Sequence, residues 1–291
     1  MGDKAGVGTT VKRLAETFLR RHGGASGLAL YALKDRLRQS RRSRQRLQKA
    51  KRDLFPSSWP VVLAGPFKGM RYIEEFTFGP IAPRWLGTYE PQLHPFLRRM
   101  SDVTYEKFID IGAAEGYYAV GVKRADASIA VISFEADPLS RRAQRRLAKL
   151  NDVSIDARGV CNHQVLNSLL QGPPALVLCD IEGGELDLID PGRCPGLLWA
   201  DVIVETHPVG GQTSLHTAQI IAARFRGTHE AVIIDDDDMA RRALLEEIEA
   251  GGLDRAVLHE HADEDRWHDN KWLVLLRPAG LRESHDRRSP C

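Results

Sequence analysis

Two short stretches of this 291-residue sequence place ionisable side chains directly after apolar runs. Asp180 and Glu182 follow one run, and Glu205 and His207 follow the next. Because the carboxyl ends of neighbouring parallel strands meet at one edge of a sheet, we expect these side chains to lie together. A histidine there could act as a general base, since its ordinary pKa is near neutrality. A histidine before Pro208 is equally typical of a hydrogen-bonded turn.

The three carboxylates of this group admit a second mechanism. Asp180, Glu182 and Glu205 offer the hard oxygen ligands that a divalent ion such as Mg²⁺ prefers, and a bound ion would lower the pKa of an acceptor hydroxyl. The sequence leaves the histidine mechanism and the metal mechanism open.

A third stretch has the features of a nucleotide-type pocket. Residues 108–118 read FIDIGAAEGYY, which predicts a strand ending near Asp110, a glycine loop and a helix. Gly112 and Gly116 would let the backbone approach a ligand closely. The spacing D-x-G-x-x-x-G differs from the dinucleotide and P-loop motifs, which hold phosphates. S-adenosylmethionine, which has no phosphate, therefore fits better than NAD or ATP.

The next predicted strand also ends in an acid, Glu135, 25 positions after Asp110. An acid at the tip of the second strand of a doubly wound fold is the usual partner of ribose hydroxyls, so we assign Glu135 to that role. The predicted cofactor site also includes the adjoining Ala113, Ala136 and Asp137. After the third strand, Cys161 and Asn162 are candidates for the adenine edge, although Asn162 could equally be a helix N-cap.

Five blocks of the chain, within about residues 65–235, resemble the ordered blocks of FkbM-like methyltransferases. The blocks are GTYEP at 87–91, DIGAAEGYY at 110–118, FEADP at 134–138, DIEGGE at 180–185 and VETHP at 204–208. The resemblance implies a class I methyltransferase fold and methyl transfer from S-adenosylmethionine, usually to a hydroxyl oxygen. It also favours a position for Tyr89 and Glu90 near the methionine end of the cofactor or near the acceptor. One departure is Cys179, where many members have lysine.

Alternating strands and helices predict an α/β fold with a mostly parallel sheet and helices on both faces. The predicted strands are 107–111, 129–135, 153–158, 175–181, 201–205, 231–234 and 272–276, and the predicted helices among them are 116–125, 138–150 and 162–171. Seven strands match the class I methyltransferase sheet, in which the resemblance implies that the last strand is antiparallel.

The chain divides into four predicted parts: a basic helical extension at 1–55, a hairpin and helix at 56–100, the S-adenosylmethionine-binding domain at 101–280 and a disordered tail at 281–291. Residues 34–52 hold ten lysines and arginines but one acid, Asp35. This segment could bind nucleic acid or another acidic partner, or could be a solvated surface.

Composition narrows the class of protein. No apolar run reaches the roughly 18 residues of a membrane span, and the N-terminus lacks the apolar core of a signal peptide, so we expect a cytoplasmic location. The four scattered cysteines indicate neither a disulfide framework nor a zinc site. The acidic stretches 235–238 and 259–265 are expected to be solvated loops.

Three functions are consistent with these observations. The first is O-methylation of a small-molecule or natural-product acceptor bearing a hydroxyl group, such as a sugar or a peptide. The second is methylation of RNA or another nucleic acid, supported by the basic segment; the tip of strand four, however, lacks the [DNS]-P-P-[YFW] sequence used for amino-nitrogen targets. The third is a non-catalytic S-adenosylmethionine-fold binding module.

Overall fold

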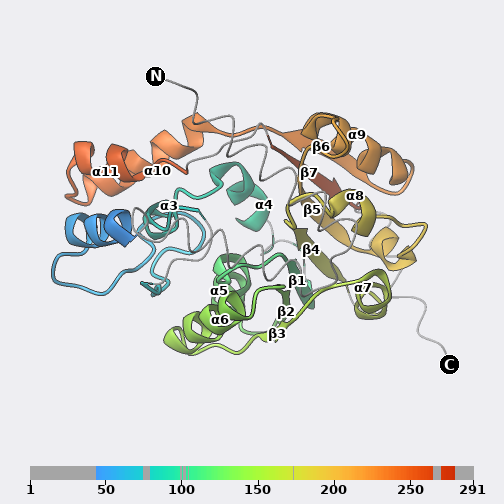
Figure 1. Ribbon diagram of the computed structural model, residues 1–291, viewed down its shortest axis with the longest axis horizontal. Coiled ribbons are helices and arrows are strands. Elements are labelled where there is room, and N and C mark those ends of the chain that lie inside the picture. Colours follow the sequence, from blue (N-terminus) through green and yellow to red (C-terminus); the bar gives the residue numbers. More distant parts are fainter. Residues whose placement is uncertain are drawn as a thin grey trace, which may run out of the picture.

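The computed structural model describes residues 44–74, 79–98, 100, 103, 105–172, 174–264 and 270–278. Its centre is a seven-stranded sheet in the order β3-β2-β1-β4-β5-β7-β6 (Figure 1). The strands are β1 Lys107–Ile111, β2 Ala130–Phe134, β3 Asp156–Arg158, β4 Ala175–Cys179, β5 Asp201–Thr206, β6 Glu230–Ile234 and β7 Lys271–Leu276. Strands β1 to β5 pair in parallel, whereas β7 pairs antiparallel with β5 and β6. The predicted α/β class and mostly parallel sheet are confirmed.

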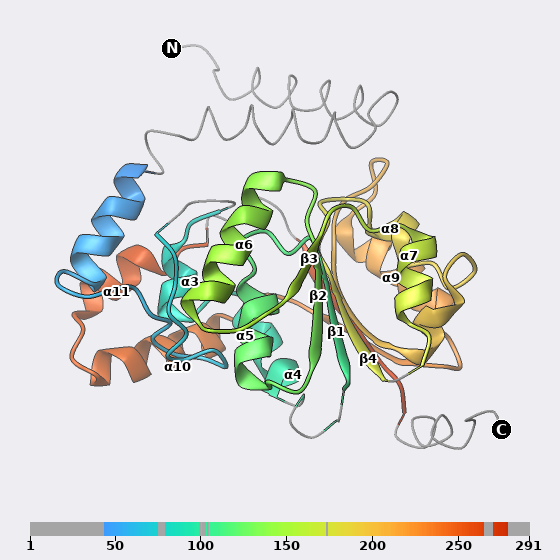
Figure 2. The same cartoon turned by 90° about the horizontal axis from the view of Figure 1, so that it is seen from below.

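Helices cover both faces of the sheet (Figure 2). One face carries α5 Tyr117–Ala125 and α6 Pro138–Leu150, and the other carries α7 His163–Leu169, α8 Glu185–Leu188 and α9 Ser214–Arg224. Four further helices lie on the same side of the sheet as α5 and α6 (Figure 2): α3 Ala82–Leu86, α4 His94–Arg98, α10 Asp238–Ala250 and α11 Arg255–His261. Short 3-10 helices precede α4 at Pro91–Leu93 and β5 at Pro195–Trp199.

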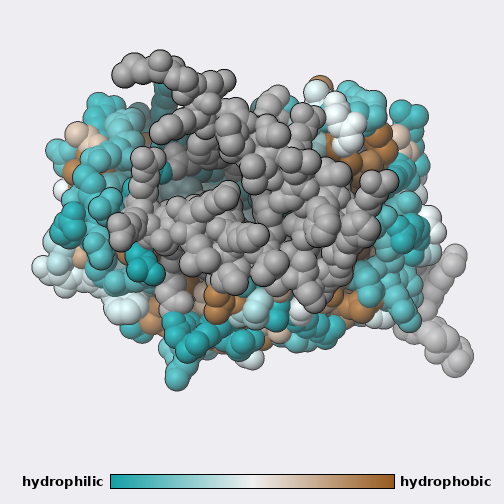
Figure 3. Space-filling view, in the orientation of Figure 1, coloured by the Kyte–Doolittle hydropathy of each residue, from teal (hydrophilic) through white to brown (hydrophobic). Residues whose placement is uncertain are grey.

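The central strands form because their residues are apolar on both sides. All five residues of β4, Ala-Leu-Val-Leu-Cys, are buried, as expected for a strand covered by helices on both faces. Two apolar clusters result, one on each side of the sheet. On the coloured part of the surface in Figure 3, hydrophilic residues predominate and hydrophobic residues lie in small separate groups.

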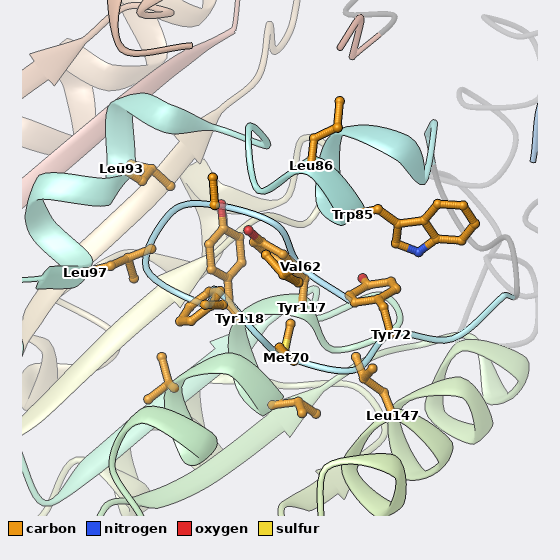
Figure 4. Close-up of a cluster of buried hydrophobic side chains, with 14 of the residues drawn as sticks. Val62, Met70, Tyr72, Trp85, Leu86, Leu93, Leu97, Tyr117, Tyr118 and Leu147 are labelled. Atoms are coloured by element: carbon orange, nitrogen blue, oxygen red, sulfur yellow. The ribbon is translucent and has the colours of Figure 1, made fainter. Parts of the chain in front are cut away.

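The segment before β1 belongs to the larger apolar cluster. Tyr72 and Trp85 are fully buried and lie with Tyr117 and Tyr118 of α5 in one group of side chains (Figure 4). Tyr72 Oη also donates a hydrogen bond of 2.8 Å to Glu115 Oε1 in the glycine loop after β1, which holds this segment against that loop. The segment therefore helps to position the carboxyl edge of the sheet.

The hairpin predicted in the segment 56–100 is present as a short antiparallel pairing. Val61 and Arg71 form a bridge, and three backbone hydrogen bonds connect its two sides: Val62 N to Met70 O at 2.8 Å, Gly69 N to Val62 O at 2.7 Å and Tyr72 N to Pro60 O at 2.8 Å. The pairing stays short because the next N–H groups, those of Leu63 and Ala64, donate instead to the carbonyl oxygens of Trp85 and Leu86 in α3.

Three local expectations need correction. β3 starts at Asp156 rather than at 153, because within the described sheet it pairs with β2 through Ile132 to Phe134 alone. Asp237 caps α10, which Asp238 begins, so the run 235–238 is partly helical. The stretch 259–265 is not a loop throughout, since α11 continues to His261.

The predicted N-terminal helix enters the described residues at 44, and residues 44–54 are helical. Ala50 and Leu54 are buried in the larger apolar cluster, and Asp53 hydrogen bonds with Lys49 and with His261 of α11. The remainder of the basic extension and the tail at 281–291 lie outside the described residues. Among the described helices, none has the length and apolar character needed to cross a membrane.

Candidate active site

The site lies at the carboxyl edge of the sheet, where β1, β2, β4 and β5 end. Ile111 of β1 is in register with Phe134 of β2 and with Cys179 of β4. The residues that follow these strands therefore meet above the edge. A backbone hydrogen bond of 2.8 Å from Asp180 N to Ile111 O joins the loop after β4 to the end of β1.

His207 lies at the centre of four carboxylates from β4, β5 and the turn into α8. Its Nδ1 is 2.9 Å from Oε1 of Glu185. On the opposite side of the ring, Nε2 is 3.5 Å from Glu182 Oε2 and 3.8 Å from both Asp180 Oδ1 and Glu205 Oε2. The structure thus brings together all four predicted catalytic residues, and their roles in catalysis are a proposal.

The carboxylates change the protonation of the histidine. Burial alone would lower the pKa of His207, but the hydrogen bond to Glu185 and the charges of Glu185, Glu205 and Glu182 raise it to about 9. The same crowding affects Asp180, whose pKa is raised by burial and by the charges of Glu205 and Glu182. At neutral pH the imidazole is therefore protonated, which differs from the freely titrating histidine expected from the sequence.

Glu185 is a functional candidate that the sequence reasoning did not assign. Its side chain is fully buried, and Oε1 accepts hydrogen bonds from Ile181 N and Gly183 N, both at 3.0 Å, as well as facing His207. The sequence did contain a signal for this role in the block DIEGGE, where Glu185 follows Glu182 by three residues. An acid at the start of a helix can accept hydrogen bonds from the N–H groups of the loop that precedes it.

The cluster resembles a metal site in composition. Asp180, Glu185 and His207 each place one possible ligand atom within 4.8 Å of the others. Oε1 of Glu185, however, is already committed to two backbone N–H groups and to the imidazole. Mg²⁺ needs near-octahedral oxygen ligands at about 2.0–2.1 Å, several of them waters. Oε2 of Glu185 and Oδ1 of Asp180 have no hydrogen-bond partner among the described residues. The third donor of the group, however, is an imidazole nitrogen, whereas Mg²⁺ prefers oxygen, so we propose no Mg²⁺-dependent step.

The glycines of the β1 loop are required by the fold itself, and their predicted approach to the cofactor stays a prediction. Both have positive φ, +90° at Gly112 and +94° at Gly116. A Cβ on Gly112 would lie 1.6 Å from Asp180 O, and one on Gly116 would lie 3.1 Å from the Gln144 side chain. Protein atoms therefore crowd the position that a Cβ would take at each glycine. Ala113 lies between them and is buried.

Glu135 lies at the tip of β2 and is 8% exposed. Its Oε2 accepts a hydrogen bond from Ala114 N at 2.9 Å, and its Oε1 accepts one from Asp137 N at 2.7 Å. A carboxylate can accept about four hydrogen bonds, so acceptor capacity remains for two hydroxyl groups. This arrangement fits the ribose of S-adenosylmethionine. Ala136 follows it directly and is partly buried.

Three of the predicted cofactor residues have a structural role in the fold. Asp110 is buried, its Oδ2 accepts from Ala119 N, and burial raises its pKa to about 7. Asp137 caps α6, and Asn162 caps α7 by accepting from Val165 N. The capping alternative for Asn162 is therefore what the structure has. Cys161 beside it is partly buried, and burial raises its pKa to about 12.

Tyr89 and Glu90 reach the same region from the loop after α3. Glu90 is 2% exposed, adopts a left-handed backbone with φ +47°, and accepts a hydrogen bond from Tyr118 of α5. The Arg84 guanidinium lies 4.0 Å from the centre of the Tyr89 ring. A buried acid with strained backbone is typical of a functional position, so a role for Glu90 near the cofactor or acceptor stays a prediction.

Comparisons with known proteins give distant likenesses. No protein-family model and no curated protein matches the chain. Solved structures do match. The chain is 14% identical to the O-methyltransferase TomG of Streptomyces achromogenes, in complex with S-adenosylmethionine, over 80% of this chain and 90% of that one, with a TM-score of 0.43.

Two further matches have similar scores. The Bacillus cereus O-methyltransferase is 12% identical over 69% of this chain and 82% of that one, with a TM-score of 0.42. The Pyrococcus abyssi tRNA (uracil-54, C5)-methyltransferase is 14% identical over 63% of this chain and 37% of that one, with a TM-score of 0.38. These neighbours are methyltransferases. Likenesses this distant carry no functional argument, and nothing in them is specific to the FkbM-like family.

Proposed function

We propose that this protein is an S-adenosylmethionine-dependent methyltransferase that methylates a hydroxyl oxygen of a small-molecule or natural-product acceptor, such as a sugar or a peptide. The observation that carries the proposal is the convergence of two groups at one edge of the sheet. Glu135 offers ribose contacts at the tip of β2, and the His207 cluster lies at the tips of β4 and β5.

The cofactor supplies a methyl group already activated by a sulfonium, so the protein needs only to align the acceptor and manage its proton. Glu135 holds the ribose hydroxyls. Glu90 and Tyr89, in the loop that packs on α5, are assigned to the side of the site where the acceptor binds. The buried aromatic rings of Tyr117 and Tyr118 keep that loop in place, since Tyr89 packs on both with centroid distances of 5.6 and 6.3 Å.

The acceptor proton is assigned to the His207 cluster. Nε2 faces Asp180, Glu182 and Glu205, while Nδ1 is held by Glu185, so Nε2 is the nitrogen available for proton exchange. Because the pKa of His207 is about 9, the neutral imidazole that accepts a proton is scarce at pH 7 and increases with pH. Turnover limited by this base should therefore rise up to about pH 9 rather than level off near neutrality.

The test is a mass-spectrometric acceptor screen with S-adenosylmethionine and libraries of sugars, peptides and phenolic natural products. One methylated product, formed by wild type and reduced about 10²–10⁴-fold in His207→Gln, is expected. Turnover of that product with unchanged rate in His207→Gln would remove the histidine from the mechanism. Methylation of RNA with none of the small acceptors modified would overturn the proposed acceptor class.

A further inference from the structure

Glu185 connects three parts of the site through one buried oxygen. Oε1 accepts from Ile181 N and Gly183 N of the loop after β4, and it faces Nδ1 of His207 after β5. The distances are 3.0, 3.0 and 2.9 Å, and the side chain is fully buried. Burying a carboxylate destabilises the fold unless hydrogen-bond donors or a positive charge compensate for the lost hydration. Here the two N–H groups and the imidazole provide that compensation.

The loop that Glu185 closes has strained backbone. Glu182 has φ +58° and Gly183 has φ +106°. Left-handed backbone at a residue with a Cβ persists only where the surrounding contacts hold it. The two N–H groups bound by Glu185 flank Glu182 on either side, so they fix the turn that directs Asp180 and Glu182 toward His207.

The imidazole is fixed from the other side by its own backbone. Thr217 of α9 donates its hydroxyl to His207 O at 2.9 Å. With the main chain held by α9 and Nδ1 held by Glu185, the ring can present only Nε2 to the acceptor side. A carboxylate that binds one ring nitrogen in this way fixes both the tautomer and the orientation of a histidine.

Building on the proposed function, we infer that Glu185 is a positioning residue of the active site: it sets the turn carrying Asp180 and Glu182 and directs His207 Nε2 toward the acceptor. It does not touch the acceptor or the cofactor, because it is fully buried beneath the turn that it closes. Its effect on the reaction passes through His207 and the turn.

Two roles can be separated by substitution. Glu185→Gln keeps an acceptor oxygen for Ile181 N and Gly183 N but removes the negative charge beside Nδ1. Glu185→Ala removes both. Glu182→Gln is the matched control, because it removes one carboxylate charge that faces the same ring, 3.5 Å from Nε2, on a side chain that is 81% exposed. The other acids facing the imidazole, Asp180 and Glu205, are unchanged in all three variants.

The first measurement is an NMR titration of the His207 ring in the full chain without cofactor or acceptor. Glu185→Gln should lower the His207 pKa by about one to two pH units, since a charge-assisted hydrogen bond exceeds a neutral one by about that much. Glu182→Gln should lower it by less than half as much, because its charge is screened by water. A His207 pKa that is unchanged in Glu185→Gln, or lowered equally by Glu182→Gln, would overturn the inference.

The second measurement is the pH dependence of turnover with an acceptor from the screen. In Glu185→Gln the rise of kcat with pH should move to lower pH with His207, while KM for the cofactor stays within about twofold of wild type. In Glu185→Ala, kcat should be reduced at every pH, because both the turn and the imidazole lose their hydrogen-bond partner. A purely structural glutamate would change thermal stability without moving the pH profile, and that result would also overturn the inference. Because the NMR titration needs no activity, it remains decisive even if the proposed reaction fails.

Discussion

The substitution Gly112→Ala tests whether the end of β1 and the loop after β4 are packed backbone against backbone. A Cβ at this position would lie 1.6 Å from Asp180 O and 2.6 Å from Asp180 C. These atoms cannot move as a flexible side chain would, so the two loops must separate. Separation would break the Asp180 N to Ile111 O hydrogen bond and displace Asp180 from the cluster around His207.

The expected loss of unfolding free energy has three parts. Holding alanine in left-handed backbone costs about 1–2 kcal/mol. Forcing an extra methyl group into a filled site costs about 1–3 kcal/mol, and the lost hydrogen bond about 1 kcal/mol. Together these predict a destabilisation of about 3–6 kcal/mol.

Gly227→Ala provides the matched control. Gly227 has φ +83°, close to the +90° of Gly112, but no neighbouring atom of the described residues lies within 4 Å of the position of its added Cβ. Only the cost of holding alanine in left-handed backbone applies here. Urea denaturation should therefore show a loss of unfolding free energy of about 1–2 kcal/mol. Equal losses for the two variants would refute the packing between Gly112 and Asp180.

Three further predictions follow from the site. Protonated His207 stabilises the fold below its unfolded pKa of 6.5, and this stabilisation is lost as pH rises through its folded pKa of about 9. The difference in unfolding free energy between wild type and His207→Gln should therefore fall by about 3 kcal/mol between pH 6 and pH 9.5, measured by urea denaturation, and a constant difference would argue against a protonated histidine. Asp137→Ala should cost about 1 kcal/mol of stability through loss of the α6 N-cap, with S-adenosylmethionine affinity within about threefold of wild type in titration calorimetry; a much larger loss of affinity would make Asp137 a direct ligand. Excess EDTA should leave turnover unchanged in a mass-spectrometric assay, and inhibition that Mg²⁺ reverses would restore the metal mechanism.

The fold could be predicted because its strands are encoded locally. The apolar runs that become β1, β2, β4 and β5 are long enough to be recognised, and their terminal acids mark one edge of the sheet. The extent of β3 was harder to predict, because the length of an edge strand depends on which residues are available for pairing rather than on its own pattern.

The site was predictable as a location but not in its electrostatics. The sequence brought Asp180, Glu182, Glu205 and His207 to one place. It could not show that a fifth group, Glu185, would bind Nδ1 and keep the imidazole protonated, because a pKa depends on burial and on distances of a few ångströms. In the same way, the positive φ of Gly112 is readable from a turn motif, whereas its contact with Asp180 O depends on the register of β1 and β4.

The most direct test of the central claim is isothermal titration of S-adenosylmethionine into wild type and into Glu135→Ala. We predict micromolar binding by wild type, and weakening by about 1–3 kcal/mol in the variant, because the ribose loses charge-assisted hydrogen bonds. Circular dichroism would check that the variant retains its fold, since Glu135 also binds Ala114 N and Asp137 N. Absence of binding by wild type, or equal affinities of the two folded proteins, would contradict a cofactor site at the tip of β2.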